Sequence, residues 1–338
     1  MRVHVFEFIC GGGLAGLPLP ATMVREGELM LAALVTDLLE LPGVQVSFAR
    51  DERLPPPDDS LRGAQVIWRA PQTPAPEALA REIDSSDAVW PIAPETGGEL
   101  ERIARAVRSA GRVLLGPDPD AIALAGSKFA TAQRLAQAGI DAVPCFRPRS
   151  AWPAIDGCWV VKPDDGAGSL GVRVFGSRDE AAGAAEREHN VIAQPWIGGE
   201  SMSLCVLGAP DAVVVLSVNR QLLRVDDGKV ELMGVEVNCE PVTAALTSLA
   251  ERVAAAIPGL RGYFGIDWVR TATGPRVIEI NPRLTTSYAG LKSALGVNVA
   301  ERVLAAGMDG PCGGGSWVRA RGQPGRAVRL MPNGHATG

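Results

Sequence analysis

The most informative stretch of this chain is Trp159-Val-Val-Lys162-Pro-Asp-Asp165-Gly166-Ala-Gly168-Ser169-Leu-Gly171-Val172. It reads as an apolar strand that ends at a lysine, then a glycine-rich reversal, and then a second strand. The glycines let backbone N–H groups approach an anion without interference from a Cβ atom. Because the ammonium group of Lys162 can lie over the same anion, the stretch predicts a loop that holds nucleotide phosphates. An ordinary glycine-rich hairpin is the alternative.

The segment Gly166-Ala-Gly168-Ser169-Leu-Gly171 also matches the dinucleotide fingerprint G-x-G-x-x-G. That fingerprint requires a helix directly after the glycines, because the helix N-terminus binds the pyrophosphate. Residues 172–175 alternate like a strand instead, and a helix is expected only after Ser177. The sequence therefore favours a hairpin flap over phosphates and disfavours a dinucleotide-binding turn.

Composition limits the class of protein. The chain has 338 residues, of which 46% are hydrophobic and 21% charged, so it can build two or three packed lobes. The net charge of −5 argues against a nucleic-acid partner. No apolar run approaches the roughly 20 residues that span a bilayer, and the cysteines form no C-x-x-C pair. We expect a cytoplasmic protein with no membrane or nucleic-acid partner, and homo-oligomer formation stays open.

The order of strand and helix patterns predicts an α/β fold. Residues 1–115 alternate strand and helix signals, which is typical of a small parallel α/β domain. In such sheets ligand groups lie at the carboxyl ends of strands, so the loops at 11–13 and 94–98 are candidates, although each can equally be a tight connection. We expect a lobe with the glycine-rich flap at 116–195, a second lobe at 196–310, and a Gly/Arg-rich tail at 311–338.

A lysine also stands at an unusual place in a helix. The segment from Ser127 to Gly139 has a serine N-cap and a glycine stop. Lys128 lies in the first turn, where a cation is unfavourable against the helix dipole. We interpret this lysine as one that faces an anion, with a solvated surface lysine as the alternative.

A second constellation lies in residues 265–283, which read as two apolar strands around a Gly-Pro turn. If the hairpin is symmetric about Thr273, Asp267 and Glu279 lie directly opposite each other, about 5 Å apart at Cβ. Asn281 lies two residues beyond Glu279 and so shares its face. Two carboxylates and an amide oxygen on one face suit Mg²⁺ or Mn²⁺, and Arg283 follows at once. Exposed acids on an edge hairpin are the alternative.

A strand between these constellations ends at Gln194-Pro195. We expect the proline to interrupt the ladder and free backbone groups of the kind that an adenine edge requires. Glu200 is then placed to accept hydrogen bonds from ribose hydroxyls. The alternative is a plain hinge between subdomains.

Taken together, these motifs resemble the ATP-grasp carboxylate–amine ligases over roughly residues 116–290. The resemblance implies an N-terminal parallel α/β domain of the pre-ATP-grasp type, followed by a two-lobed α+β ATP-grasp domain. It implies ATP and Mg²⁺ (or Mn²⁺) as cofactors, and a small-molecule carboxylate and a small-molecule amine as substrates.

The resemblance also implies roles for individual residues. ATP would be held by Lys128 and Lys162, by the flap residues Gly166, Gly168, Ser169 and Gly171, by Gln194, Trp196 and Ile197 at the adenine, and by Glu200 at the ribose. The metal would be held by Asp267, Glu279 and Asn281. Arg283, Lys162 and Arg220 would act in catalysis, and Asn219 would reach the substrate or the γ-phosphate beside Arg220.

Further segments resemble the tyramine–glutamate ligase branch of that family. They are 6–13, 25–27 with Met30, 92–96 and 281–288. The likeness implies amide formation between glutamate and tyramine or a tyrosine-like amine through an acyl phosphate, in methanofuran- or methylofuran-type cofactor biosynthesis. A ligase for another amino acid or peptide, or a catalytically silent nucleotide-binding protein, stays open as an alternative.

Overall fold

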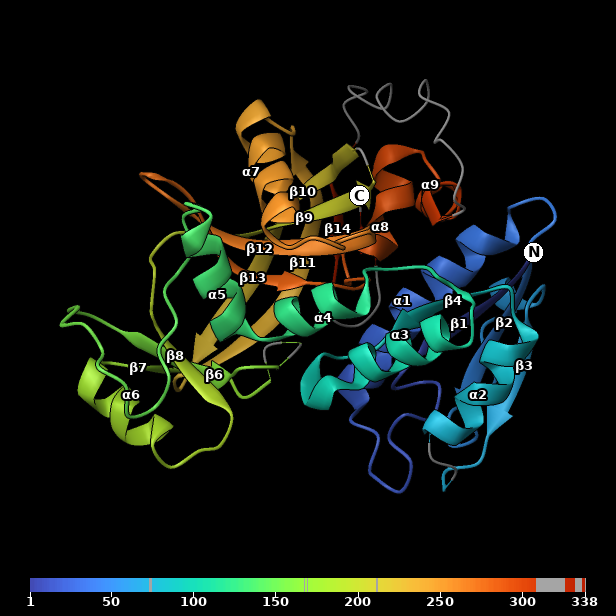
Figure 1. The fold of residues 1–338 in the computed structure, drawn as a ribbon, viewed down its shortest axis with the longest axis horizontal. Helices are drawn as coiled ribbons and strands as arrows, with labels where there is room; N and C mark the ends of the chain where they lie inside the picture. Colours follow the sequence, from blue (N-terminus) through green and yellow to red (C-terminus); the bar gives the residue numbers. More distant parts are fainter. Residues whose placement is uncertain are drawn as a thin grey trace.

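The computed structural model describes residues 1–72, 75–166, 168, 170–210, 212–307, 326–331 and 336–337. Its N-terminal part, on the right in Figure 1, is built on a parallel sheet in the order β3-β2-β1-β4-β5. The strands are β1 (Arg2–Glu7), β2 (Gln45–Asp51), β3 (Gln65–Arg69), β4 (Ala88–Ile92) and β5 (Val113–Leu114). The helices that connect them are α1 (Ala21–Leu39), α2 (Ala75–Ser85) and α3 (Glu99–Ser109), with short 3-10 turns η1 (Asp59–Leu61) and η2 (Thr96–Gly98).

The strand order creates a switch point in this sheet. The chain leaves β1 toward β2 and β3 on one side, and then returns to place β4 against the other edge of β1. Crevices at the carboxyl ends of strands on either side of such a reversal are where α/β sheets bind ligands. Glu7 ends β1 and Ile92 ends β4, so these two residues lie beside the expected crevice.

A large mixed sheet forms the rest of the molecule, in the order β13-β12-β9-β10-β11-β7-β6-β8. One side of it is made of β6 (Trp159–Pro163), β7 (Arg173–Phe175) and β8 (Val191–Pro195), at the lower left of Figure 1. The other side is made of β9 (Glu200–Ala209), β10 (Ala212–Asp226), β11 (Lys229–Glu240), β12 (Gly262–Thr271) and β13 (Gly274–Asn281). Near the C-terminus, β14 (Val328–Leu330) pairs with β11 and with β15 (Ala336–Thr337).

Helices cover this sheet and join it to the N-terminal part. They are α4 (Pro119–Gly126), α5 (Lys128–Gln137), α6 (Arg178–Ala185), α7 (Ala244–Ala256), α8 (Tyr288–Leu295) and α9 (Val299–Gly307). Helix α1 packs against α8 and α9, and one apolar core contains residues of all three helices. Within it, the Tyr288 hydroxyl donates a hydrogen bond of 2.8 Å to the Asp37 carboxylate. The two parts of the molecule therefore pack against each other through a shared apolar core.

The predicted α/β fold class is confirmed: a parallel sheet with connecting helices comes first, and a large mixed sheet covered by helices follows it. Within residues 1–115, β3 and α2 were not predicted. β3 is an edge strand, and most of its residues are exposed or partly exposed. No helix in the described part of the chain is long and apolar enough to cross a membrane.

Candidate active site

The acidic pair of the late hairpin is brought together as predicted. Asp267 on β12 pairs in register with Glu279 on β13, although the hairpin is not symmetric about Thr273. From Thr271↔Gly274 to Trp268↔Val277 the register follows a two-residue turn, and it shifts by one residue between Trp268 and Asp267. Ile278 is therefore the extra residue of a bulge. The bulge restores the facing pair and leaves both Ile278 and Glu279 lining the same cavity.

Asp267 and Glu279 lie in different electrostatic environments. Burial and the neighbouring Glu279 carboxylate raise the pKa of Asp267, although its side chain accepts hydrogen bonds from Gln221 and Asn281. Burial also raises the pKa of Glu279, but Lys128 and Lys162 outweigh it and hold that pKa below its usual range. The pair therefore carries unrelieved repulsion on the Asp267 side.

These residues fit a divalent cation. Asp267, Glu279 and the Asn281 amide supply hard oxygen atoms on one face, the donor type that Mg²⁺ prefers. A cation between the two carboxylates would also offset the repulsion that raises the pKa of Asp267. The described residues contain no group of three or more His, Cys, Asp or Glu side chains that could hold a metal. A site with two carboxylates suits an ion that keeps water or phosphate among its ligands.

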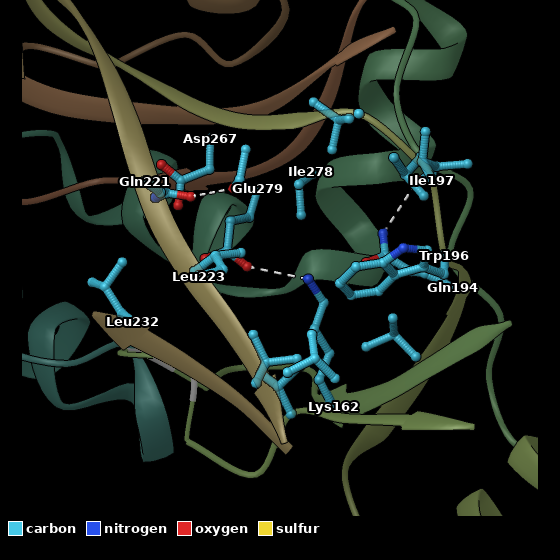
Figure 2. Close-up of a pocket in the computed structure, with 18 of the residues that line it drawn as sticks. Lys162, Gln194, Trp196, Ile197, Gln221, Leu223, Leu232, Asp267, Ile278 and Glu279 are labelled. Carbon is cyan, nitrogen blue, oxygen red and sulfur yellow. Dashed lines mark hydrogen bonds and ion pairs between the residues drawn. The ribbon is translucent and has the colours of Figure 1, made fainter. Parts of the chain in front are cut away.

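Two buried lysines converge on Glu279. The Nζ atoms of Lys162 and Lys128 lie 3.3 Å and 3.5 Å from Glu279 Oε2. Figure 2 shows the Lys162 side chain pointing at that carboxylate, with Asp267 and Gln221 close by. Lys128 also donates to the carbonyl oxygen of Gly166 at 2.5 Å. The prediction that Lys128 faces an anion is confirmed, and in this structure the anion is the Glu279 carboxylate.

Asp164 explains how the two lysines are positioned. This buried residue follows β6, and its carboxylate accepts hydrogen bonds from the Phe129 N–H and the Ser127 hydroxyl at 2.8 Å each. Its carbonyl oxygen accepts from the Lys128 N–H at 3.0 Å. The end of β6 is thereby tied to the N-terminus of α5, so Lys162 and Lys128 are held side by side.

The glycine-rich loop has the conformation that its sequence indicates. Gly168 and Gly171 have φ of 66° and 73°, in the left-handed region that favours glycine. A strand, β7, follows, and Ser177 caps α6 by accepting from the Glu180 N–H. The hairpin flap is confirmed, and the dinucleotide turn is excluded. Ser169, predicted to contact phosphate, lies outside the described residues.

The first cavity has a volume of about 550 Å³. It lies between β6 and β8, on one part of the mixed sheet, and β9 to β13, on the other part. The predicted site residues that line it are Lys128, Lys162, Gly166, Gln194, Trp196, Ile197, Glu200, Arg220, Asp267 and Glu279. Apolar side chains, among them Val160, Leu222 and Ile278, form its walls. A polar end with two lysines and an apolar end beside Trp196 suit a phosphorylated, aromatic ligand.

The hinge differs from the sequence prediction in its backbone. The expectation that Pro195 interrupts the ladder is wrong, because Pro195 stays in register with Trp159. The Trp196 N–H is also occupied, donating to the Cys158 carbonyl oxygen at 2.8 Å. The Gln194 side chain donates to the Val143 carbonyl oxygen at 3.2 Å. Proline has no N–H to donate, but it can occupy the end of a strand where no neighbouring carbonyl oxygen requires a donor.

Arg220 and Glu200 form ion pairs at the wall of the first cavity. Arg220 lies 3.0 Å from Glu236 and 3.5 Å from Glu200, and Glu200 lies 3.3 Å from Arg270. Both remain placed to contact a ligand. Asn219 does not: it is fully buried, bonded to Ser203 and Cys205, so the expectation that it reaches a substrate is wrong. Adjacent strand residues point to opposite faces, which separates Asn219 from Arg220.

A second cavity, of about 530 Å³, lies between the N-terminal part and the mixed sheet. It shares Asp267 and Glu279 with the first cavity and is also lined by Asn281 and Arg283. Arg283 forms an ion pair of 3.0 Å with Glu95, which follows β4. The carboxyl ends of β1 and β4 reach this cavity through Glu7, Ile92 and Pro94, whereas residues 11–13 do not line it.

Glu7, Glu26 and Gln221 are polar residues that line the second cavity and were not predicted as site residues. Glu7 and Glu26 lie in the segments on which the resemblance to the tyramine–glutamate ligase branch rests, so a signal was present. No local pattern assigned them a role, because the cavity forms only when α1 and β1 meet β12 and β13.

Comparison with known proteins agrees with this geometry. Residues 125–287 match the family described as an ATP-grasp domain, and residues 44–122 match the pre ATP-grasp 3 domain. The chain is 26% identical over 291 residues to tyramine--L-glutamate ligase of Methanocaldococcus jannaschii, covering 85% of this chain and 84% of that protein. It is 32% identical over 234 residues to phosphoribosylamine--glycine ligase of Mycobacterium leprae, covering 61% of this chain but only 55% of that protein.

Among solved structures, a putative ATP-grasp superfamily protein from Archaeoglobus fulgidus has a TM-score of 0.70 at 21% identity. The match covers 98% of this chain and 92% of that one. At this identity the likeness concerns the fold.

Proposed function

This chain belongs to the ATP-grasp family, with a pre-ATP-grasp domain ahead of the ATP-grasp domain, and from that premise we propose that it is an ATP- and Mg²⁺-dependent carboxylate–amine ligase. One observation carries the proposal: Asp267 and Glu279 line both cavities. A nucleotide in the first cavity and a carboxylate in the second would therefore meet at one acidic pair. Phosphoryl transfer between two ligands requires that juxtaposition.

The first step would be phosphorylation of the substrate carboxylate. A carboxylate oxygen attacks the γ-phosphorus, the bond to the β-phosphate oxygen breaks, and ADP leaves. Lys128 and Lys162 would hold the phosphates, and the flap at Gly166, Gly168 and Gly171 would exclude water from the acyl phosphate. Asp267, Glu279 and Asn281 would hold Mg²⁺, which supplies charge neutralisation at the phosphates when bound.

The second step would form the amide. The amine nitrogen attacks the acyl carbon, the C–O bond to phosphate breaks with its electron pair on phosphate, and the nitrogen loses a proton. Arg283 lines the second cavity beside Asp267 and Glu279, where it would stabilise the acyl phosphate. Arg220, on the wall of the first cavity, would stabilise the transferred phosphoryl group.

Glutamate and tyramine, or a tyrosine-like amine, are the proposed substrates. The Methanocaldococcus jannaschii relative that bears these substrates in its name matches over most of both chains. Met23, Met30 and Ile92 line the second cavity, and such apolar walls suit the ring of an aromatic amine better than a sugar phosphate. We further propose that the product serves methanofuran- or methylofuran-type cofactor biosynthesis.

ADP release tests the proposal. The full chain is mixed with ATP and MgCl₂ and with a grid of amino acids against aromatic amines, including glutamate with tyramine and with tyrosine. We expect ADP and phosphate at a substantial rate only when both partners are present, together with the amide by mass spectrometry. Nucleotide binding without turnover for every pair would instead indicate a silent binding protein. ADP release without any amide would contradict the ligase.

A further inference from the structure

We infer that Glu26, supported by Glu7, recognises the amine substrate as an ammonium cation at the N-terminal wall of the second cavity. This inference rests on the proposed ligase function and names the residues that select its amine. The two carboxylates come from different elements, Glu26 from α1 and Glu7 from the end of β1, and both line the same cavity.

Glu7 is a buried carboxylate at the end of β1. Glu7 is only 3% exposed, and its Oε2 atom accepts a hydrogen bond of 2.6 Å from the Cys10 N–H. Within the described part of the chain, neither Glu7 nor Glu26 forms an ion pair. Burial raises the pKa of Glu7 to about 7 and raises that of Glu26 as well. The ionised form of such a buried carboxylate would be stabilised by a ligand that brings a positive charge.

The backbone makes room for Glu7. Gly27 lies inside α1, where glycine costs about 1 kcal/mol of helix stability relative to alanine. A Cβ built on Gly27 would lie 2.6 Å from Glu7 Oε2, too close for any side chain. The helix therefore carries a glycine where the carboxylate needs space, which is the mark of a built site.

Glu26 lies next to the reaction centre. A Cβ built on Gly168, in the flap, would be 3.8 Å from Glu26 Oε2. The positive charge of Arg283 acts on the same carboxylate, lowering the pKa that burial raises. Glu26 is thus placed between the flap over the phosphates and the arginine beside the acidic pair. An amine held there is near the acyl carbon. Its ammonium form must first give one proton to a carboxylate of this wall, and the freed electron pair then attacks, which favours the held amine over a remote amino group of the carboxylate substrate.

The apolar neighbours complete the match. Met23 and Met30 flank Glu26 on the same face of α1, and Ile92 approaches from β4. An amine with a cationic end and an uncharged body satisfies both parts of this wall. The cavity thereby distinguishes a protonated amine from a neutral molecule of the same shape.

The test compares tyramine with 4-ethylphenol, which has the same ring and no ammonium group. The proteins are the wild type, Glu26→Gln, Glu7→Gln and, as a control at the C-cap of the helix that carries Glu26, Glu40→Gln, which is exposed and pairs with Lys292. Steady-state ADP release is measured against tyramine, glutamate and ATP in turn. Tyramine binding is measured separately by calorimetry with Mg²⁺ and a nonhydrolysable ATP analogue.

We expect Glu26→Gln to raise the KM for tyramine and its dissociation constant by about tenfold or more, and to leave the KM for ATP and glutamate within about twofold. Inhibition by 4-ethylphenol should be unchanged, a result that loss of structure would not give. Glu7→Gln should act in the same direction, and Glu40→Gln should match the wild type. A rise in the KM for glutamate instead, or equal tyramine titrations for wild type and Glu26→Gln, including no heat from either, overturns the inference. Absence of turnover with intact, Glu26-dependent tyramine binding would count against the ligase alone.

Discussion

Asp267 and Glu279 are chemically alike but lie in unequal surroundings. Both are carboxylates on facing strands, yet Glu279 has Lys128 and Lys162 as counter-ions, whereas Asp267 accepts from two amides and is affected by Lys162 only as the smallest of its influences. In the absence of a metal, the two lysines stabilise the ionised form of Glu279, whereas ionised Asp267 remains unfavourable. A nucleotide would draw the lysines to its phosphates, and a cation could then take their place at the acids.

When EDTA keeps the protein free of metal, replacing each acid by its amide should therefore change the unfolding free energy in opposite directions. Asp267→Asn should raise the free energy of unfolding at pH 8 by about 1–2 kcal/mol, because it removes a carboxylate whose ionisation folding disfavours. Since the folded pKa of Asp267 is raised, the gain should shrink as pH falls toward 4. Glu279→Gln should lower the unfolding free energy by about 2 kcal/mol, because two buried lysines lose their partner.

Urea titrations at pH 8 and pH 5 measure the two changes in unfolding free energy, and ADP release measures the turnover of each variant. Both variants should lose turnover at least about a hundredfold, since each lacks one proposed metal ligand. Equal stability changes of the same sign would argue against the unequal pairing.

At the scale of elements, the N-terminus of α5 and the end of β6 act as one unit through Asp164. The lysine on each element owes its position to that connection, although the two lysines are 34 residues apart in the chain. The bulge at Ile278 has a similar role in the hairpin, since it sets which face Glu279 presents.

Asp164→Ala should lower the unfolding free energy by about 3 kcal/mol, because a buried carboxylate that accepts from Phe129 and Ser127 is removed. It should also weaken ATP binding by about tenfold, because Lys128 is no longer held beside Lys162. Urea unfolding and calorimetry with an ATP analogue check the two effects.

Ser177→Ala is the matched control, because it removes the N-cap of α6 away from the cavities. It should cost about 1 kcal/mol of stability and leave ATP affinity unchanged. An Asp164→Ala protein with normal ATP affinity would show that the lysines are held by other contacts.

At the scale of the whole molecule, the shared core between α1, α8 and α9 sets the second cavity. The Asp37–Tyr288 hydrogen bond lies within that core, and the Glu95–Arg283 ion pair joins the same two parts at another point. Strand β1 runs through the centre of the N-terminal sheet and carries two buried titratable groups, His4 and Glu7. Global stability should therefore depend on pH through this strand.

His4 should make the protein less stable in mild acid. Burial, and then the charge of Arg69, lower its pKa from 6.5 to about 3, so the folded protein stays unprotonated where the unfolded chain takes up a proton. Its stabilising contribution is complete above pH 6.5 and is lost as pH falls toward 3, by about 2 kcal/mol at pH 5.

The difference in unfolding free energy between wild type and His4→Gln, measured in urea at pH 7.5 and pH 5, isolates this term. The wild type should lose about 2 kcal/mol more than the variant between the two pH values. The opposite pH dependence of Glu7 is common to both proteins and cancels in the difference. A difference that does not change with pH would place the His4 pKa near its ordinary value.

Several features followed from the sequence alone, because each depends on residues close together in the chain. The strand–loop–strand around Lys162 and the Ser127 and Ser177 caps follow from local periodicity and glycine conformation. The facing of Asp267 and Glu279 was also predicted, but a bulge at Ile278 produces it and not the symmetry of the hairpin. The parallel N-terminal sheet followed from alternating elements in the same way, although β3 and α2 were missed.

Only the tertiary structure decided which side chains from distant segments meet. Glu279 meets Lys128, Glu95 meets Arg283, and Glu26 meets the flap because separate sheets pack against a common core. The burial of Asn219 and the in-register place of Pro195 likewise depend on neighbouring strands. Such contacts join residues far apart in the chain, and their geometry follows from packing that no local pattern encodes.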